Sequence, residues 1–316
     1  MSALYINKII KKKILFLLIF IITFFILCLK LNIFLLINFS NQIIISIDFN
    51  IDLINSLFSL IVLIISLGVL FYRKFYFRFN ISKSYKTNLI IFILSIIILI
   101  NRRRIIILLI GWDGLGISSF FLVSFYINLN RIISSLITFF FNRLGDGFIL
   151  IICSIILNET INIIIINFNL FIFILFFIGL ITKSSQIPFG VWLPIAIAAP
   201  TPISSLVHSS TLVTAGIFVL IKIEFLFFIK EIQLIIINFS SITFILAGIF
   251  SVSILDFKKA VAFSTLSQIG FILFSLSIGN LIIAFYHLLF HAMFKSSIFV
   301  NLGVFINFNL SIQDRR

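Results

Sequence analysis

Apolar stretches long enough to cross a lipid bilayer recur along nearly the whole of this 316-residue sequence. An α-helix needs about 20 apolar residues to span the hydrocarbon core. Only 10% of the residues are charged, whereas an ordinary soluble domain carries about 25%. The sequence therefore predicts an all-α, polytopic transmembrane protein with about nine or ten spans. They are expected near 14–39, 55–72, 89–100, 105–127, 131–157, 161–182, 201–221, 232–254, 260–277 and 279–307.

Two of these boundaries need comment. The run 14–39 is too long for a signal peptide and has no small-residue cleavage site, so we expect a retained helix. Residues 40–54 are more polar and are expected at the membrane interface, with extended segments. The run 89–100 reaches only about 18 Å as a helix. We therefore expect its helix to begin upstream.

The formal net charge of +14 would suggest nucleic acid as a partner if the protein were soluble. Here most of the cations lie in short connections between the apolar runs, as in Lys11–Lys13 and Arg102–Arg104. Anchoring beside anionic lipid headgroups explains that placement better. We expect membrane lipids as partners and no nucleic acid. The cations are too evenly spread to predict the orientation in the membrane.

The stretch 181–222 interrupts the pattern, because Lys183 is followed closely by Pro188, Pro194, Pro200 and Pro202. In a membrane, irregular backbone persists only where it is buried in protein or lines a wet cavity. Discontinuous helices near the midplane are a common way to build ion sites. The sequence predicts a broken helix near 183–194 that holds an amine able to exchange its proton. A lysine that extends from a helix end to the interface is the alternative.

Other ionisable side chains also lie inside apolar runs, where each costs about 2.5–3.5 kcal/mol at a helix centre. Asp113 stands between glycines, and it has either a functional role or a structural cation partner. Arg143 and Asp146 are three residues apart, so they share a helix face and can form an ion pair. A purely structural ion pair is the alternative. His208 is either a proton-transfer group or a satisfied core histidine.

His287, His291 and Lys295 recur every fourth residue, so they form one stripe along a single helix. The pattern favours a proton relay, and a structural hydrogen-bonding stripe stays open. A metal site is disfavoured because no third ligand is evident and a lysine completes the stripe. Four charged residues near span ends are weaker candidates, which ordinary interfacial anchoring also explains: Lys222, Asp256, Lys258 and Lys259.

No cofactor or metal is expected in this chain. The sequence has no phosphate-binding glycine loop, no GxSxG motif, no cysteine framework for an iron–sulfur cluster and no haem-attachment motif. Cys28 and Cys153 lie in different apolar runs and are expected to be small buried side chains. A pump of this kind would take its energy from elsewhere.

Six strings carry a resemblance, in family order, over about residues 50–304: GWDGLG, NRLGD, KSSQIPFGVWLP, APTPISSLVHSSTLVTAGIF, DFKKAVAFSTLSQIG and HLLFHAMFKSSIFVNLG. Together they resemble the subunit 5 family of respiratory complex I, the proton-pumping NADH:ubiquinone oxidoreductase. NRLGD and the context of His208 favour this subunit over the two other antiporter-like subunits. The family is also similar to the large subunits of multisubunit sodium/proton antiporters.

The resemblance implies roles for these residues. Asp113 matches an acidic residue that pairs with the lysine of the broken helix, here Lys183, and Asp146 matches the acid of the arginine–acid motif. His208 matches a histidine between the two halves. The stripe that ends at Lys295 matches the relay of the second half.

The implied function is proton translocation coupled to NADH:ubiquinone electron transfer, with no redox centre in this chain, in the mitochondrial inner membrane. The implied partners are other membrane-arm subunits, including the neighbouring antiporter-like subunit. A sodium/proton antiporter subunit and a non-pumping scaffold are the alternatives.

The expected organisation has three parts. Residues 1–104 hold N-terminal helices and loops, 105–222 the first antiporter-like repeat, and 223–316 a partial second repeat. Members of the family continue further. We therefore expect a split or reduced subunit whose second repeat a separate chain completes, and a fragment of a longer protein is the competing reading.

Overall fold

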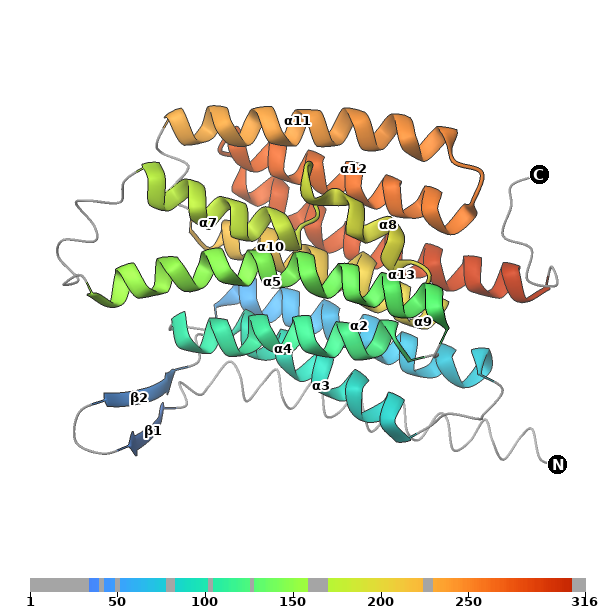
Figure 1. Ribbon diagram of the computed structural model, residues 1–316, viewed down its shortest axis with the longest axis horizontal. Helices are drawn as coiled ribbons and strands as arrows, with labels where there is room; N and C mark the ends of the chain where they lie inside the picture. The colour runs from blue at the N-terminus through green and yellow to red at the C-terminus, as the bar shows by residue number, and fades with distance from the viewer. Residues whose placement is uncertain are drawn as a thin grey trace.

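The computed structural model describes residues 34–39, 43–48, 52–77, 83–101, 105–125, 128–158, 170–223 and 230–308. Nearly all of these residues are helical, and the helices lie side by side along the long axis of the molecule (Figure 1). Six helices are long and apolar enough to cross a membrane, and three shorter apolar helices accompany them within the described ranges. The predicted all-α, polytopic membrane fold is confirmed.

The helix bounds follow the predicted apolar runs closely. The helices and helical turns are α2 (Leu53–Tyr76), α3 (Lys83–Ile100), α4 (Ile105–Val123), α5 (Leu129–Asn158), α7 (Leu170–Lys183), η2 (Phe189–Val191), α8 (Trp192–Ala196), α9 (Thr201–Ile203), η3 (Ser204–Thr211), α10 (Leu212–Ile221), α11 (Lys230–Ser253), α12 (Phe257–Ser277) and α13 (Leu281–Phe308). As expected, α3 begins upstream of residue 89. The predicted span 161–182 is observed only from Leu170, because 161–169 lie outside the described residues.

A short antiparallel hairpin precedes the bundle. It consists of β1 (Phe34–Phe39) and β2 (Ile43–Asp48), with Phe34 opposite Asp48. The prediction of one helix over 14–39 is therefore wrong at 34–39, and residues 14–33 lie outside the described part. That run exceeds the roughly 20 residues that a span needs. Its end can therefore pair with the β-branched stretch that follows the polar residues 40–42, and residues 43–48 are extended, as expected.

The interrupted region lies in the middle of the bundle. Figure 1 shows α11 at one edge and α3 near the other, with α7, α8 and α10 between them. The side chains of 201–207 and 211–221 are all buried: α2 and α13 pack against η3, and α10 packs against α7. This arrangement keeps the polar backbone of the break away from lipid, as irregular backbone at membrane depth requires.

Candidate functional site

The helix break at the end of α7 satisfies its own backbone. A helix that stops leaves carbonyl groups without partners. Here the backbone amide of Gln186 donates to the Ile181 carbonyl at 3.2 Å, and Trp192 Nε1 donates to the Thr182 carbonyl at 2.8 Å. Ser185 lies between them with φ of +54°. The chain after the break therefore folds back onto the end of α7 and fixes its last residue.

That last residue is Lys183, whose side chain is 0% exposed. Its Nζ donates to the Trp112 carbonyl at 2.5 Å, lies 4.1 Å from the centroid of the Trp112 ring, and is 3.6 Å from Asp146 Oδ1. The C-terminal end of a helix is its negative pole and favours a cation there. The alternative of a lysine extending to the interface is therefore wrong, and the amine is buried inside the protein.

Arg143 connects this lysine to a second carboxylate. Its Nη1 lies 3.3 Å from Asp113 Oδ1 and 3.3 Å from Asp146 Oδ2. The other oxygen of Asp146, a residue only 3% exposed, faces Lys183. Four ionisable groups from α4, α5 and α7 thus form one chain in the order Asp113, Arg143, Asp146 and Lys183. We call these four residues the charge network.

The direct Asp113–Lys183 pair that the resemblance implies is not formed. Successive residues on an α-helix are turned by about 100°. Trp112 faces Lys183 with its carbonyl and its ring, so the next side chain on α4 points away from the lysine and reaches Arg143 instead. The structure adds Arg143 as the link between the two residues.

Glycines set how closely α5 and α7 approach at the network. A Cβ built on Gly145 would collide with the side chain of Thr182 and lie 3.1 Å from the Gly179 carbonyl. Gly145 directly precedes Asp146, and Thr182 directly precedes Lys183. Small residues let helix backbones approach closely in membranes. The glycine of the NRLGD string therefore brings the carboxylate and the amine together.

This contact predicts a difference between two neighbouring glycines. Gly145→Ala should separate α5 from α7, lower the melting temperature by an amount equivalent to about 1–3 kcal/mol, and impair any function of the Asp146–Lys183 pair. Gly147→Ala is the control, because a Cβ there meets nothing within 4 Å. Thermal unfolding of both variants in detergent measures the difference. Equal melting temperatures would contradict the close approach.

A second group of polar side chains lies between α12 and α13. His287 Nε2 is 3.1 Å from Gln268 Oε1, and Lys295 Nζ donates to Ser264 Oγ at 2.7 Å. The partners on α12 are four residues apart and therefore share one face. The predicted stripe on α13 faces a matching polar stripe on α12. We call His287, His291 and Lys295 the histidine–lysine stripe.

His291 lies in the middle of this stripe and is 5% exposed. Neither ring nitrogen has a hydrogen-bond partner among the described residues. A buried polar group without a partner costs free energy, and a functional role is one reason for a protein to keep it. In the described part of the chain, no three His, Cys, Asp or Glu side chains gather in a way that could hold a metal ion.

The weaker candidates take up different positions. Lys222 and Lys259 form partly exposed ion pairs with Asp52 at 2.8 Å and Asp256 at 2.7 Å, as interfacial anchors do. Lys258, by contrast, is buried.

Two further predictions concern a histidine and the cysteines. The backbone of His208 belongs to η3, but its side chain lies outside the described residues, as does Cys28. Cys153 is buried and free, as expected.

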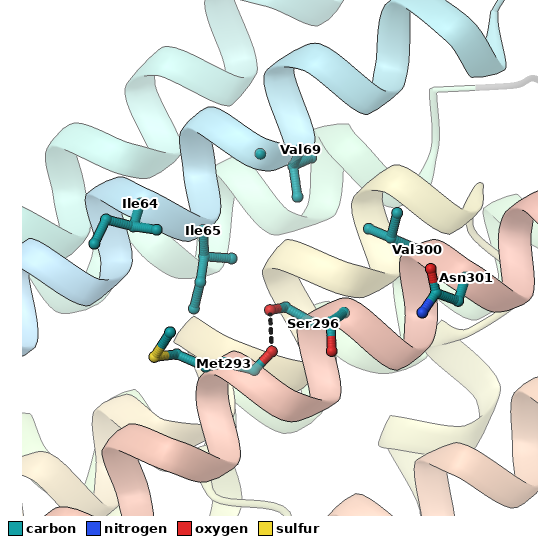
Figure 2. Close-up of a pocket in the computed structure, with 9 residues that line it drawn as sticks. Ile64, Ile65, Val69, Met293, Ser296, Val300 and Asn301 are labelled. Atoms are coloured by element: carbon teal, nitrogen blue, oxygen red, sulfur yellow. Dashed lines mark hydrogen bonds between the residues drawn. The ribbon is translucent and has the colours of Figure 1, made fainter. Parts of the chain in front are cut away.

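A groove of about 270 Å³ lies on another side of α13, against α2 (Figure 2). Ile65 and Val69 of α2 and Met293 and Val300 of α13 give it apolar walls, and the Ser296 hydroxyl bonds its own helix at the Met293 carbonyl. None of the groove residues is ionisable. The groove is therefore separate from the two sets of charged side chains.

Sequence reasoning missed four residues of these sites. Trp112 contacts the lysine, Gln268 and Ser264 bond the stripe, and Asn142 is a buried amide whose side chain has no partner among the described residues. Asn142 lies one turn before Asp146 on the same face of α5. Polar residues four apart in an apolar run would have indicated these positions on α5 and α12.

Comparison with known proteins identifies a family. Residues 103–314 match the family described as NADH:quinone oxidoreductase/Mrp antiporter, TM. NADH-ubiquinone oxidoreductase chain 5 of Mytilus edulis is 40% identical over 288 residues, which cover 88% of this chain and 50% of that protein. The same chain of Lumbricus terrestris is 38% identical, covering 84% and 47%. This chain thus spans about half the length of the curated relatives it matches.

Solved structures show the same fold. A chain of the Mrp complex from Dietzia sp. DQ12-45-1b superposes with a TM-score of 0.78 at 25% identity, covering 87% of this chain and 32% of that one. A chain of the archaeal membrane-bound sulfane sulfur reductase gives a TM-score of 0.77 at 20% identity, covering 92% and 63%. The family match extends over the charge network and the histidine–lysine stripe. The chain belongs to the NADH:quinone oxidoreductase/Mrp antiporter family of membrane proteins.

Proposed function

We propose that this chain translocates protons in the membrane arm of a respiratory NADH:ubiquinone oxidoreductase and carries no redox chemistry itself. The observation that carries the proposal is the fully buried amine of Lys183 at a helix break, with the carboxylate of Asp146 3.6 Å away. A buried ionisable group in a membrane is costly, so it is a functional candidate by default. A lysine in such a place can exchange its proton when a nearby charge moves.

Arg143 is the group whose movement would change the charge around the lysine. A guanidinium stays protonated, so Arg143 carries a permanent positive charge that both carboxylates share. When it moves toward Asp113, Asp146 is left to hold a charged Lys183. When it moves toward Asp146, the carboxylate is neutralised and the lysine releases its proton. Electron transfer elsewhere in the assembly would drive this movement.

The released proton would continue along the histidine–lysine stripe. His287, His291 and Lys295 are the carriers, and Gln268 and Ser264 orient the first and last of them. His208 would link the charge network to the stripe, with water filling the gaps. The partly exposed pairs of Lys222 and Lys259 would anchor the helices at the interface and take no part in the transfer.

The relatives support a particular setting. Both are named NADH-ubiquinone oxidoreductase chain 5, so the proposed partners are the other membrane-arm subunits of that complex, including the neighbouring antiporter-like one. The proposed location is the mitochondrial inner membrane. The proposed repeats are 105–222, which contains the charge network, and the part from 223 onward, which contains the stripe.

A sodium/proton antiporter subunit is the second candidate, since the chain superposes on a chain of an Mrp complex. Membrane vesicles that contain the assembled complex distinguish the two. NADH oxidation should acidify the vesicle interior without added sodium if the first proposal holds. Proton movement that requires a sodium gradient and ignores NADH would favour the antiporter.

Lys295→Met tests the stripe and separates a pump from a scaffold. The variant should lose most NADH-driven acidification and retain ubiquinone reduction in uncoupled vesicles, because the amine bonded to Ser264 is removed. Lys230→Met is the control, since Lys230 is exposed at the start of α11. Unchanged acidification in the Lys295 variant would show that this half of the chain is only structural.

A further inference from the structure

We propose that Trp112 on α4 is a positioning residue for Lys183. It holds the ammonium group from one side, and Asp146 on α5 holds it from the other. This inference rests on the proposed function and concerns a residue outside the charge network. It concerns where the amine lies while it carries its proton. The two anchors belong to different helices, so a small shift of α4 against α5 changes the balance between them.

The contact geometry makes Trp112 the nearest polar partner of the amine. Nζ is 2.5 Å from the Trp112 carbonyl and 3.6 Å from the Asp146 carboxylate. The same residue places its indole ring under the amine, with 4.1 Å between Nζ and the ring centroid. One residue therefore supplies both a hydrogen-bond acceptor and a π-face to a single buried cation.

These two contacts respond differently to the proton. The carbonyl accepts a hydrogen bond from the charged or the neutral amine. The face of the indole carries partial negative charge and attracts the ammonium form. The ring is therefore the charge-sensitive half of the contact, and in a desolvated site its effect is larger than at a surface.

The surroundings of Trp112 keep it in place. The side chain is 0% exposed, and its neighbour Gly111 packs so closely on α3 that an added Cβ would lie 2.8 Å from the Leu99 amide nitrogen. On the other side, Asp113 is bonded to Arg143. The tryptophan is thus fixed from both directions. Lys183 approaches this residue from the end of α7.

Few other charges face the amine. Asp146 and Arg143 on α5 and Asp113 on α4 are the charged groups that act on Lys183. The other helical segments packed nearby, α8 and α10, contain no ionisable side chain. When Arg143 neutralises Asp146, the indole face stays in direct contact with the charge, and Asp113 attracts it from farther away. Trp112 would then delay release of the proton until the amine leaves the ring.

A substitution series isolates the ring, because the backbone carbonyl stays in every variant. Trp112→Phe keeps a weaker π-face, and Trp112→Leu removes it. Side-chain ¹⁵N NMR of the full chain in lipid bilayers reports the charge of the Lys183 amine, with the signal assigned by its loss in Lys183→Gln. The pH at which half of the amine is charged should fall by about one unit in Trp112→Leu and by less in Trp112→Phe.

Phe173→Leu is the control for the loss of a buried aromatic side chain. Phe173 is also 0% exposed and lies on α7, about 15 Å along the helix from Lys183. It should leave the midpoint unchanged. If Trp112→Leu does not fold, Trp112→Phe still decides the matter against the native chain. A midpoint shared by the native chain and the folded Trp112 variants would overturn the inference.

NADH-driven acidification in vesicles separates this inference from the proposed function. A shifted midpoint with normal pumping would uphold Trp112 as the positioning residue and refute the role of Lys183 in translocation. Lost pumping with an unshifted midpoint would refute the positioning role of Trp112 and leave the role of Lys183 in translocation standing. If both hold, the pH profile of pumping should move in the same direction as the NMR midpoint.

Discussion

Lys183→Met should abolish NADH-driven proton translocation while the complex still assembles. Methionine matches most of the length of lysine and is apolar, so it fits a site that is 0% exposed without a charge to bury. Asp146 would keep Arg143 as its cation at 3.3 Å, so the substitution does not leave a buried carboxylate unpaired. The variant removes the exchangeable proton and little else.

The measurement compares acidification with electron transfer in the same vesicles. Ubiquinone reduction by NADH should persist when the membrane is uncoupled, whereas acidification should fall to the background. Lys259→Met is the matched control, since Lys259 is exposed and its ion pair with Asp256 is formed within one helical turn at the start of α12. Normal proton stoichiometry in Lys183→Met would refute the proposed role of the amine.

The position of Lys183 follows from the sequence because its causes are local. Pro188 cannot continue the preceding helix, and a cation just before it stands at the pole of a helix that favours it. The apolar runs similarly predict the helices, since spanning length is a property of each run by itself. These features depend on neighbours along the chain and not on the packing of distant segments.

The pairing within the charge network could not be predicted in the same way. Whether Asp113 or Trp112 faces Lys183 depends on how α4 is rotated about its axis, and a step of one residue changes the answer. That rotation is set by packing between helices, where Gly111 and Gly114 lie against α3. For the same reason, the contacts of Gln268 and Ser264 with the stripe depend on how α12 packs against α13.

The pairing of β1 with β2 shows a different limit. An apolar run longer than a membrane span does not say where its helix must end. Short apolar segments also fit strands as well as helices, and β-branched residues favour the strand. The pairing of β1 with β2 depends on both segments, and the periodicity along one of them does not reveal it.

Arg143→Leu should have the largest effect on stability, because one guanidinium nitrogen serves two carboxylates. Removing one partner of a buried ion pair costs about 3–5 kcal/mol, and the lower end applies here since Arg143 is partly exposed. The network, neutral when all four groups are charged, would carry a net charge of −1. Lys183 would then be held in its charged form, and proton release should stop together with acidification.

A double variant shows whether charge balance or shape is responsible. Asp113→Asn together with Arg143→Leu restores a neutral network with Asp146 and Lys183 as its only charges, and it should recover part of the melting temperature that Arg143→Leu loses. Arg143→Lys keeps the cation and should retain more stability than Arg143→Leu. Thermal unfolding of the native chain, Asp113→Asn, Arg143→Leu and the double variant in detergent gives the coupling free energy of the Asp113–Arg143 contact. If the losses in unfolding free energy of the two single variants add up to that of the double variant, Arg143 does not link the carboxylates. Its movement could then not control the proton of Lys183.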